Sequence, residues 1–325
     1  MSRHPFKSTA ALLSKMPGAS ATDIFMPSQS STLVCLIHGV TGTPMEMKYL
    51  GRQLWRQGWD VYLPTCPGHC STFRELLRSN EEAWLGHVRT QLSYARRHYQ
   101  NIFAVGLSAG ALLALEASIS VPLQGIGVLS PTFFYDGWNT PRTQKLLQFG
   151  IRWLPSPLHY IFFHFDRFPY GIKNPALQAR LREAYHPIAR LKQRLRRLLG
   201  RSSSKPERRH SSAAVGYPVF FLKTLADLDR LYARVKRNLH RVTVPTLIIQ
   251  ARDDDFTSPK NSELVYHAIS SFDRKLLLLD DCYHVITVDR QRDVVTRELA
   301  QFIHSHLNRA EDFALSASRP REAVP

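Results

Sequence analysis

The chain has 325 residues, of which 44% are hydrophobic, and it carries a formal net charge of +17 at pH 7. This length and composition predict two domains, or one α/β domain with an insertion, around a sizeable buried core. The positive charge indicates an anionic partner such as lipid headgroups, nucleic acid or an acidic substrate, and it carries no information about the fold. Four cysteines are too few for a disulfide framework in a chain of this length and are typical of a reducing compartment.

The sequence contains no apolar run of the length that a secretory signal or a membrane-spanning helix requires. We therefore expect a cytoplasmic protein that is at most peripheral to a membrane. Nucleic acid is the less favoured anionic partner, because no recognised nucleic-acid-binding module accompanies the basic charge. Residues 1–30 are expected to form a basic N-terminal arm, and the polar residues 308–325 a disordered tail.

Alternating strand-like and helix-like segments run through two parts of the chain, residues 31–130 and 242–307. Strands are expected at 32–37, 60–64, 101–105, 123–129, 244–249 and 275–280. Helices are expected at about 44–58, 81–99, 111–118 and 258–270, and after the last strand up to residue 307. This alternation predicts an α/β fold with a mostly parallel sheet and helices on both faces, in which ligands bind at the carboxyl ends of the strands.

Residues 131–241 interrupt the alternation, and we interpret them as a long helical lid insertion. Large apolar side chains crowd residues 143–170, where they either form an ordinary packed core or cover an apolar acyl pocket. Residues 189–199 then place leucines on one helical face and arginines on the other. The basic stretch 189–209 can therefore lie on an anionic membrane; alternatively, its leucines pack on the body of the protein and its arginines remain in solvent.

The motif G-x-S-x-G at residues 106–110 stands between an expected strand and an expected helix. Small residues around Ser108 allow the chain to reverse sharply there, which exposes the serine hydroxyl at the tip of the turn. The first amides of the following helix point to the same place and favour an anion. The sequence therefore predicts a nucleophilic serine, provided that the rest of the chain supplies a base and an acid.

A serine hydroxyl needs a base within hydrogen-bond reach, and that base needs an orienting carboxylate. Of the 14 histidines, only His284 lies in a loop immediately after a late expected strand. Asp253, Asp254 and Asp255 follow the preceding strand, and their spacing does not decide which of them faces the histidine. The order Ser, Asp, His along the chain is that of α/β-hydrolases.

Cys66, His69 and Cys70 lie close together, and a zinc site at this place is conceivable. A C-x3-C spacing without a second matching pair is weak evidence for zinc. We therefore expect neither a metal nor a cofactor.

Five segments of the chain resemble the α/β-hydrolase superfamily, and within it the bacterial carboxylesterase and monoacylglycerol lipase group of serine aminopeptidase S33-like hydrolases. The matching segments are 38–44, 67–69, 106–110, 245–255 and 284–287. The resemblance implies that Asp254 is the acid and that the backbone amides of Val40 and Ala109 form the oxyanion hole. The chain departs from the family's usual glycines at Cys70 and Tyr283, and we expect these changes to alter the shape of the substrate pocket.

By this resemblance Ser108 attacks an ester carbonyl, His284 takes the serine proton, Asp254 stabilises the imidazolium, and water releases the acyl group. We therefore expect a serine ester hydrolase that acts on a small apolar acyl ester. An acyl thioesterase or an acyltransferase with the same residues is the second interpretation. A basic, membrane-surface binding protein on a hydrolase scaffold is the non-enzymatic one.

Overall fold

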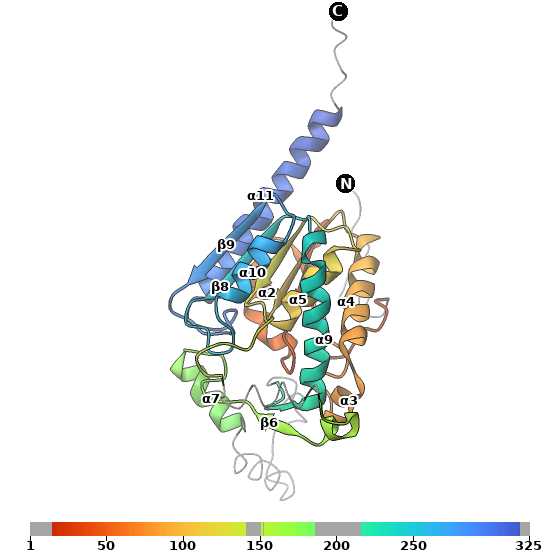
Figure 1. Ribbon diagram of the computed structural model, residues 1–325. Helices are drawn as coiled ribbons and strands as arrows, with labels where there is room; N and C mark the ends of the chain where they lie inside the picture. The colour runs from red at the N-terminus through yellow and green to blue at the C-terminus, as the bar shows by residue number, and fades with distance from the viewer. Residues whose placement is uncertain (1–14, 141–150, 152, 186–215, 319–325) are drawn as a thin grey trace, which may run out of the picture.

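The computed structural model describes residues 15–140, 151, 153–185 and 216–318, and within it a seven-stranded sheet forms the centre of the molecule (Figure 1). The strand order is β1-β3-β2-β4-β5-β8-β9, and only β1 runs antiparallel to its neighbour. The strands are β1 (Ile24–Met26), β2 (Thr32–Ile37), β3 (Asp60–Leu63), β4 (Asn101–Leu107), β5 (Gly125–Leu129), β8 (Thr246–Ala251) and β9 (Arg274–Leu279). The mostly parallel sheet predicted from the sequence is confirmed.

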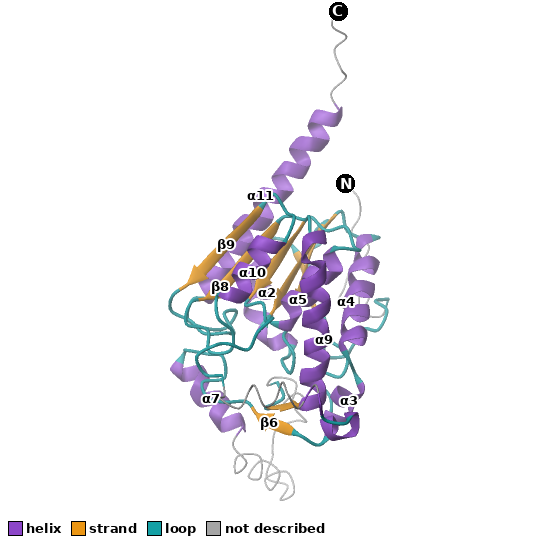
Figure 2. Cartoon of the chain, in the orientation of Figure 1, coloured by secondary structure: helices purple, strands orange, loops and turns teal. Residues whose placement is uncertain are grey.

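The central strands are buried on both faces, which is why they read as continuous apolar runs rather than as alternating ones. Every residue of β2 and β5 is buried, and each face of the sheet packs against its own apolar cluster. Helices cover both faces in Figure 2. One cluster includes side chains of α4 (Glu81–Arg96), α5 (Ala109–Ser118), α9 (Leu222–Asn238) and α10 (Lys260–Ala268), and the other those of α2 (Lys48–Trp55) and α11 (Arg292–Ser318).

Residues that follow β5 form a smaller layer at the edge of the sheet where the parallel strands end (Figure 2). This layer consists of the 3₁₀ helix η2 (Ser156–Tyr160), the two-stranded sheet of β6 (Phe163–Phe165) and β7 (Val219–Phe221), and helix α7 (Pro175–Tyr185). Three further short elements are η1 (Pro44–Glu46), α3 (Phe73–Arg78) and η3 (Leu239–Arg241). The small layer therefore lies over the edge at which a ligand site was expected.

Helix α9 belongs to the core and not to the insertion in which the sequence analysis placed it. Leu228, Leu231 and Val235 are buried, and the helix packs against α4 and α5. An amphipathic pattern shows that one face of a helix is buried but does not identify the surface against which it packs. The predicted insertion 131–241 is therefore too long at its C-terminal end.

Both terminal boundaries also differ from the prediction. Met16 and Phe25 are buried, and β1 pairs with β3, so the sheet begins inside the arm predicted for residues 1–30. Helix α11 continues to Ser318, beyond the end at Leu307 that the sequence indicated. Within the described part of the chain, no helix is long and apolar enough to cross a membrane.

Candidate active site

Ser108 lies at the junction of β4 and α5, in a backbone conformation that is unusual for a residue with a side chain. Its φ is 57° and its ψ is −119°. The two glycines of the motif permit this sharp turn: a Cβ atom on Gly106 would lie 2.0 Å from the carbonyl oxygen of Gly110, and one on Gly110 would lie 2.3 Å from that of Ile37. The sequence motif therefore follows from close backbone contacts, and the strained position of Ser108 is typical of a functional residue.

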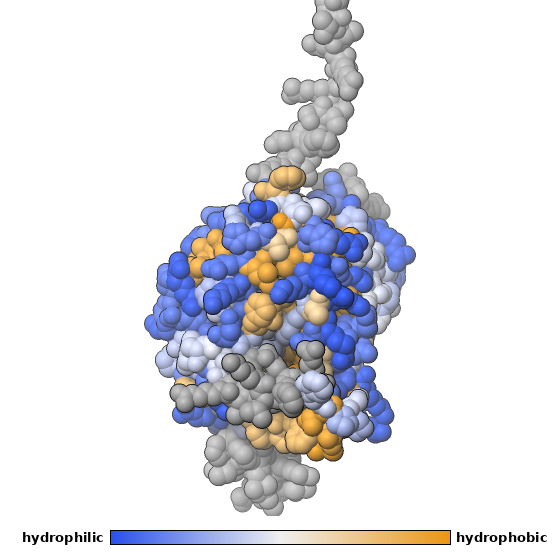
Figure 3. All heavy atoms as spheres, viewed as in Figure 1, coloured by the Kyte–Doolittle hydropathy of each residue, from blue (hydrophilic) through white to orange (hydrophobic). Residues whose placement is uncertain are grey.

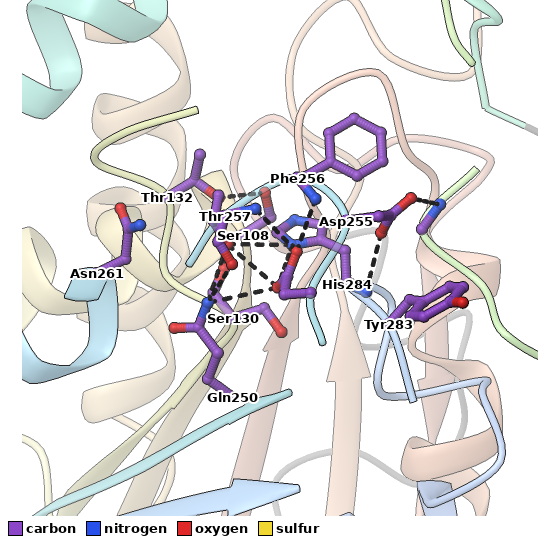
Figure 4. Close-up of polar contacts among 12 residues, drawn as sticks. Ser108, Ser130, Thr132, Gln250, Asp255, Phe256, Thr257, Asn261, Tyr283 and His284 are labelled. Carbon is purple, nitrogen blue, oxygen red and sulfur yellow. Dashed lines mark hydrogen bonds and ion pairs between the residues drawn. The ribbon is translucent and has the colours of Figure 1, made fainter. Parts of the chain in front are cut away.

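His284 lies beside this turn (Figure 4), and it forms a buried pair with Asp254. Nδ1 of His284 lies 2.9 Å from Oδ2 and 3.1 Å from Oδ1 of Asp254. Burial opposes protonation of the imidazole, but the carboxylate of Asp254, together with Asp255 and Glu46, outweighs burial, and the pKa of His284 is raised. The Nδ1 atom is therefore occupied by the carboxylate, which leaves Nε2 as the nitrogen that can act as a base.

The three consecutive aspartates have different surroundings. The side chain of Asp253 is 61% exposed and lies 3.6 Å from Nζ of Lys173. Asp255 accepts a hydrogen bond from the amide of Gly171 at 3.0 Å. Asp254 alone of the three hydrogen-bonds the His284 ring.

Hydrogen bonds from the turn after β8 fix the carboxylate of Asp254. It accepts the amides of Phe256 and Thr257, both at 2.9 Å, and the hydroxyl of Thr257 at 3.1 Å. The side-chain amide of Gln250 also donates to this carboxylate, with Nε2 lying 3.4 Å from Oδ2. The sequence analysis did not identify Thr257 or Gln250, because no motif marks a residue whose role is to hold a carboxylate in place.

Ser108 and His284 line the same cavity, of about 260 Å³, at the carboxyl edge of the sheet. Among the residues described, no hydrogen bond joins the Ser108 hydroxyl to the His284 ring, and Oγ of Ser108 instead lies 3.0 Å from Oγ1 of Thr132. Contacts of this kind are often long in the absence of substrate and tighten when substrate binds.

The two amides predicted to bind an oxyanion belong to the loop after β2 and to the first turn of α5. Val40 lines the cavity, in the loop after β2. Ala109 is the first residue of α5, so its amide has no acceptor within the helix. The loop and the turn are close together, because a Cβ atom on Gly39 would lie 3.3 Å from Cβ of Ser108.

Two buried histidines hold the loop that carries Val40. Nε2 of His69 accepts the amide of Thr41 at 3.1 Å, and Nε2 of His38 accepts the amide of Cys66 at 3.1 Å. Burial lowers the pKa of His69 to about 4 and that of His38 to about 3, so both rings are neutral acceptors at neutral pH. The sequence analysis considered His69 as a zinc ligand and as part of the matching segment 67–69, and it missed this role.

Carboxyl groups are concentrated around the cavity. Burial raises the pKa of Glu46 to about 8 and that of Asp166 to about 7, and both residues line the cavity. Burial also raises the pKa of Asp255 to about 6. No motif in the sequence marked Glu46 or Asp166. Within the described chain, no group of three or more His, Cys, Asp or Glu side chains has a geometry that could hold a metal ion.

The segment between β6 and α7 is fastened to the core by Asp289. Its carboxylate is buried and accepts the amides of Lys173 at 2.7 Å, Asn174 at 2.8 Å and Tyr283 at 2.8 Å. Because Tyr283 directly precedes His284, the same carboxylate positions both the cavity wall and the histidine loop.

The two departures from the family pattern have different structural effects. Cys70 has a φ of 54°, which is the left-handed conformation that favours the glycine usually found there. The ring of Tyr283 packs against Trp138 and lies under Nζ of Lys173. Neither residue is among those that line the two cavities beside the site. The expectation that they alter the shape of the substrate pocket stays a prediction.

Among the described residues of the aromatic segment 143–170, some face the site and others do not. Tyr170 lines the cavity that contains Ser108, and Phe165 lines a second, smaller cavity of about 110 Å³. Many of the large apolar side chains here are exposed: Trp153, Tyr160, Ile161, Phe162, Phe163, Phe165 and Phe168. Apolar side chains gather near β6 at the lower edge of the face shown in Figure 3. Residues 141–150 and 152 and the basic stretch 189–209 lie outside the described residues.

A mostly parallel sheet, a serine at a strand–helix turn and a His–Asp pair at the same edge define the α/β-hydrolase class of proteins. Within this class the chain belongs to the family described as serine aminopeptidase, S33, whose model matches residues 28–291. The resemblance found in the sequence is therefore confirmed.

Relatives and solved structures agree with this assignment. A carboxylesterase of Bacillus subtilis (strain 168) is 24% identical over 271 residues, which are 83% of this chain and 91% of the relative. A thermostable monoacylglycerol lipase of Bacillus sp. (strain H-257) is 23% identical over 305 residues, which are 89% of this chain and 97% of the relative. The structure of a soluble variant of monoglyceride lipase from Saccharomyces cerevisiae superposes with a TM-score of 0.67 at 18% identity, covering 87% of this chain and 91% of that one.

Proposed function

We propose that this protein is a carboxylic ester hydrolase with Ser108 as nucleophile, His284 as general base and Asp254 as the carboxylate that orients the histidine. The observation that carries the proposal is the buried His284–Asp254 pair, whose histidine lines the same cavity as Ser108. The names of the two bacterial relatives, a carboxylesterase and a monoacylglycerol lipase, support the same reaction class.

The reaction proceeds in two halves through an acyl-enzyme. Oγ of Ser108 attacks the ester carbonyl while Nε2 of His284 takes the serine proton, and the new oxyanion binds the amides of Val40 and Ala109. The imidazolium then protonates the leaving alcohol, and the ester C–O bond breaks. A water molecule, deprotonated by His284, attacks the acyl-enzyme and releases the acid. Each oxyanion donor contributes about 3 kcal/mol to stabilisation of the transition state.

The second cavity provides space for an apolar acyl chain. It adjoins the cavity of Ser108, because Tyr135, Asp166, Phe220 and Phe256 line both. Its wall also contains apolar side chains of both the core and the small layer: Phe133, Ile151, Phe165 and Leu225. We therefore propose an ester with an apolar acyl chain as the substrate, and a lid role for the part of the small layer that carries Ile151 and Phe165.

Hydrolysis of p-nitrophenyl esters of graded acyl length tests both parts of this proposal. Ser108→Ala is expected to lower the rate by several orders of magnitude, and Ser120→Ala, a change at an exposed serine, is the matched control. A medium-chain ester is expected to give a higher kcat/KM than the acetate. Equal rates for Ser108→Ala and the wild type would refute the serine mechanism, and a preference for acetate would refute the acyl cavity.

A thioesterase or acyltransferase would share these residues, and the net charge of +17 favours an anionic substrate such as acyl-CoA. Parallel assays with acyl-CoA and with the p-nitrophenyl ester of the same acyl chain distinguish these reactions. If the protein is instead a binding protein on a hydrolase scaffold, a fluorophosphonate will not label Ser108.

We also propose contact with an anionic membrane through the exposed apolar side chains of residues 153–168, which are those of Trp153, Tyr160, Ile161, Phe162, Phe163, Phe165 and Phe168. Monomeric soluble proteins rarely expose a large contiguous apolar patch unless it binds something. Arg167 and Arg182 are exposed beside this surface, and the guanidinium of Arg182 lies 4.6 Å from the ring centre of Phe168. A second copy of the chain would bring the same positive charge, whereas an anionic bilayer is complementary to it. The basic stretch 189–209 would add to this attraction.

A further inference from the structure

We propose that Thr132 is a positioning residue that holds the hydroxyl of Ser108 away from His284 until a substrate binds. The inference rests on the proposed role of Ser108 as nucleophile. Thr132 lies just after β5 and is 2% exposed, and its Oγ1 is 3.0 Å from Oγ of Ser108 (Figure 4).

The hydrogen-bond partners of Thr132 indicate the direction of this contact. Oγ1 of Thr132 donates to the carbonyl oxygen of Ser130 at 3.4 Å. A hydroxyl group carries one hydrogen, so when Oγ1 of Thr132 donates to Ser130 it accepts in its bond with Ser108. The hydroxyl of Ser108 therefore donates to Thr132, and its proton is directed away from the imidazole that would remove it.

The backbone of Ser108 is held on both sides of this contact. Its amide donates to the carbonyl oxygen of Leu129 at 2.9 Å, and the turn is fixed by the close approach of Gly106 and Gly110. Oγ of Ser108 can consequently move by rotation about χ1, while the rest of the residue stays in place. Thr132 is buried and β-branched, so its own hydroxyl has little rotational freedom.

The bond to Thr132 exists before attack and must be broken during it. An interaction that stabilises the ground state but not the transition state slows the reaction. Thr132 is therefore expected to lower the reactivity of Ser108, and its removal should raise that reactivity. Removal of a residue with a supporting structural role would instead lower the reactivity of Ser108. The sign of the change separates the two roles.

The test is the second-order rate constant for labelling of the full-length protein by a fluorophosphonate, together with kcat/KM for a p-nitrophenyl ester. Thr132→Val keeps the shape of the side chain and removes the acceptor, and we expect both constants to rise about threefold to tenfold. Thr132→Ser keeps the hydroxyl and should react at the wild-type rate. The midpoint of the pH profile should not change, because the His284–Asp254 pair is untouched.

Thr132→Ala also removes the acceptor and serves as a second test if the valine variant does not fold. Unchanged or slower labelling in the folded acceptor-deleted variant would overturn the inference and leave the proposed function intact. If Ser108→Ala is labelled as fast as the wild type, the proposed function itself fails. The two failures are therefore distinguishable in one set of measurements.

Discussion

Nδ1 of His284 lies 2.9 Å from Oδ2 of Asp254, and the side chain of the aspartate is completely buried. The carboxylate therefore has two effects on the histidine: it fixes the ring so that Nε2 is the free nitrogen, and it raises the pKa of the imidazole against the opposing effect of burial. Both effects depend on a charge that cannot be shielded by water at this site.

Asp254→Asn is expected to lower kcat by about four orders of magnitude, because an amide does not stabilise the imidazolium and favours the wrong tautomer. The acid limb of the pH–rate profile should also move to lower pH, since the charge that raises the pKa of His284 is lost. Asp253→Asn, at the exposed neighbour, should retain wild-type rates. A large loss in Asp253→Asn with none in Asp254→Asn would show that the acid is assigned to the wrong residue.

The neutral ring of His69 links the stability of the loop that carries Val40 to pH. In the folded protein the pKa of His69 is about 4, whereas the unfolded value is about 6.5. Below pH 6.5 the unfolded state binds the additional proton, so folding stability falls as the pH decreases toward 4. At pH 5 the resulting loss of folding stability is about 2 kcal/mol, and at pH 8 there is no such loss.

His69→Gln removes the titration and keeps a side-chain oxygen that can accept the amide of Thr41. The free energy of unfolding of the variant minus that of the wild type should therefore increase by about 2 kcal/mol between pH 8 and pH 5, because only the wild type loses this stability. Urea unfolding at a series of pH values measures this difference. A difference that does not vary with pH would show that the imidazole is not held neutral in the fold.

The sequence identified the elements whose signal is local. The run 32–37 predicted the bounds of β2 because a strand buried on both faces is apolar throughout. Ser108 was found because the turn around it needs glycines at fixed positions. Asp254 was named through the family resemblance only, since three adjacent aspartates have the same composition and differ only in the contacts made by one turn.

The features that the sequence did not reveal depend on contacts between distant segments. Thr132 reaches Ser108 across 24 positions in the chain, and His69 reaches Thr41 across 28. Threonine and histidine at such positions follow no motif, because only the folded sheet brings them together. The placement of α9 was wrong for the same reason: the periodicity of its apolar residues did not show that α4 and α5 supply its partner surface.

Asp289 is predicted to contribute more to stability than an average surface charge. Asp289→Asn leaves at least one of the three amides without an oxygen acceptor in a buried site, and we expect a loss of about 2 kcal/mol of unfolding free energy. Asp280→Asn, at a carboxylate that is 78% exposed and paired with Arg252, is the matched control and should cost less than about 1 kcal/mol. Equal losses in the two variants would contradict the proposed fastening of residues 173–174 to the core.

The exposed apolar surface of residues 153–168 predicts binding to vesicles. Ile161 is 65% exposed and Phe162 is 49% exposed. Replacement of both by serine removes two side chains that would each contribute about 1.5–3 kcal/mol on full burial, so partition onto phosphatidylglycerol vesicles should fall at least tenfold. Cosedimentation of the protein with these vesicles, and with phosphatidylcholine vesicles as the neutral comparison, measures the change.

Phe272→Ser is the matched control for this experiment, because Phe272 is fully exposed but lies in the turn before β9, far from residues 161 and 162 in the chain. It should bind vesicles as the wild type does. All variants should hydrolyse a soluble short-chain ester at the wild-type rate, since neither Ile161 nor Phe162 lines the two cavities. Equal partition of the double variant and the wild type, or dimers of the wild type that the double substitution dissociates, would show that this surface does not bind lipid.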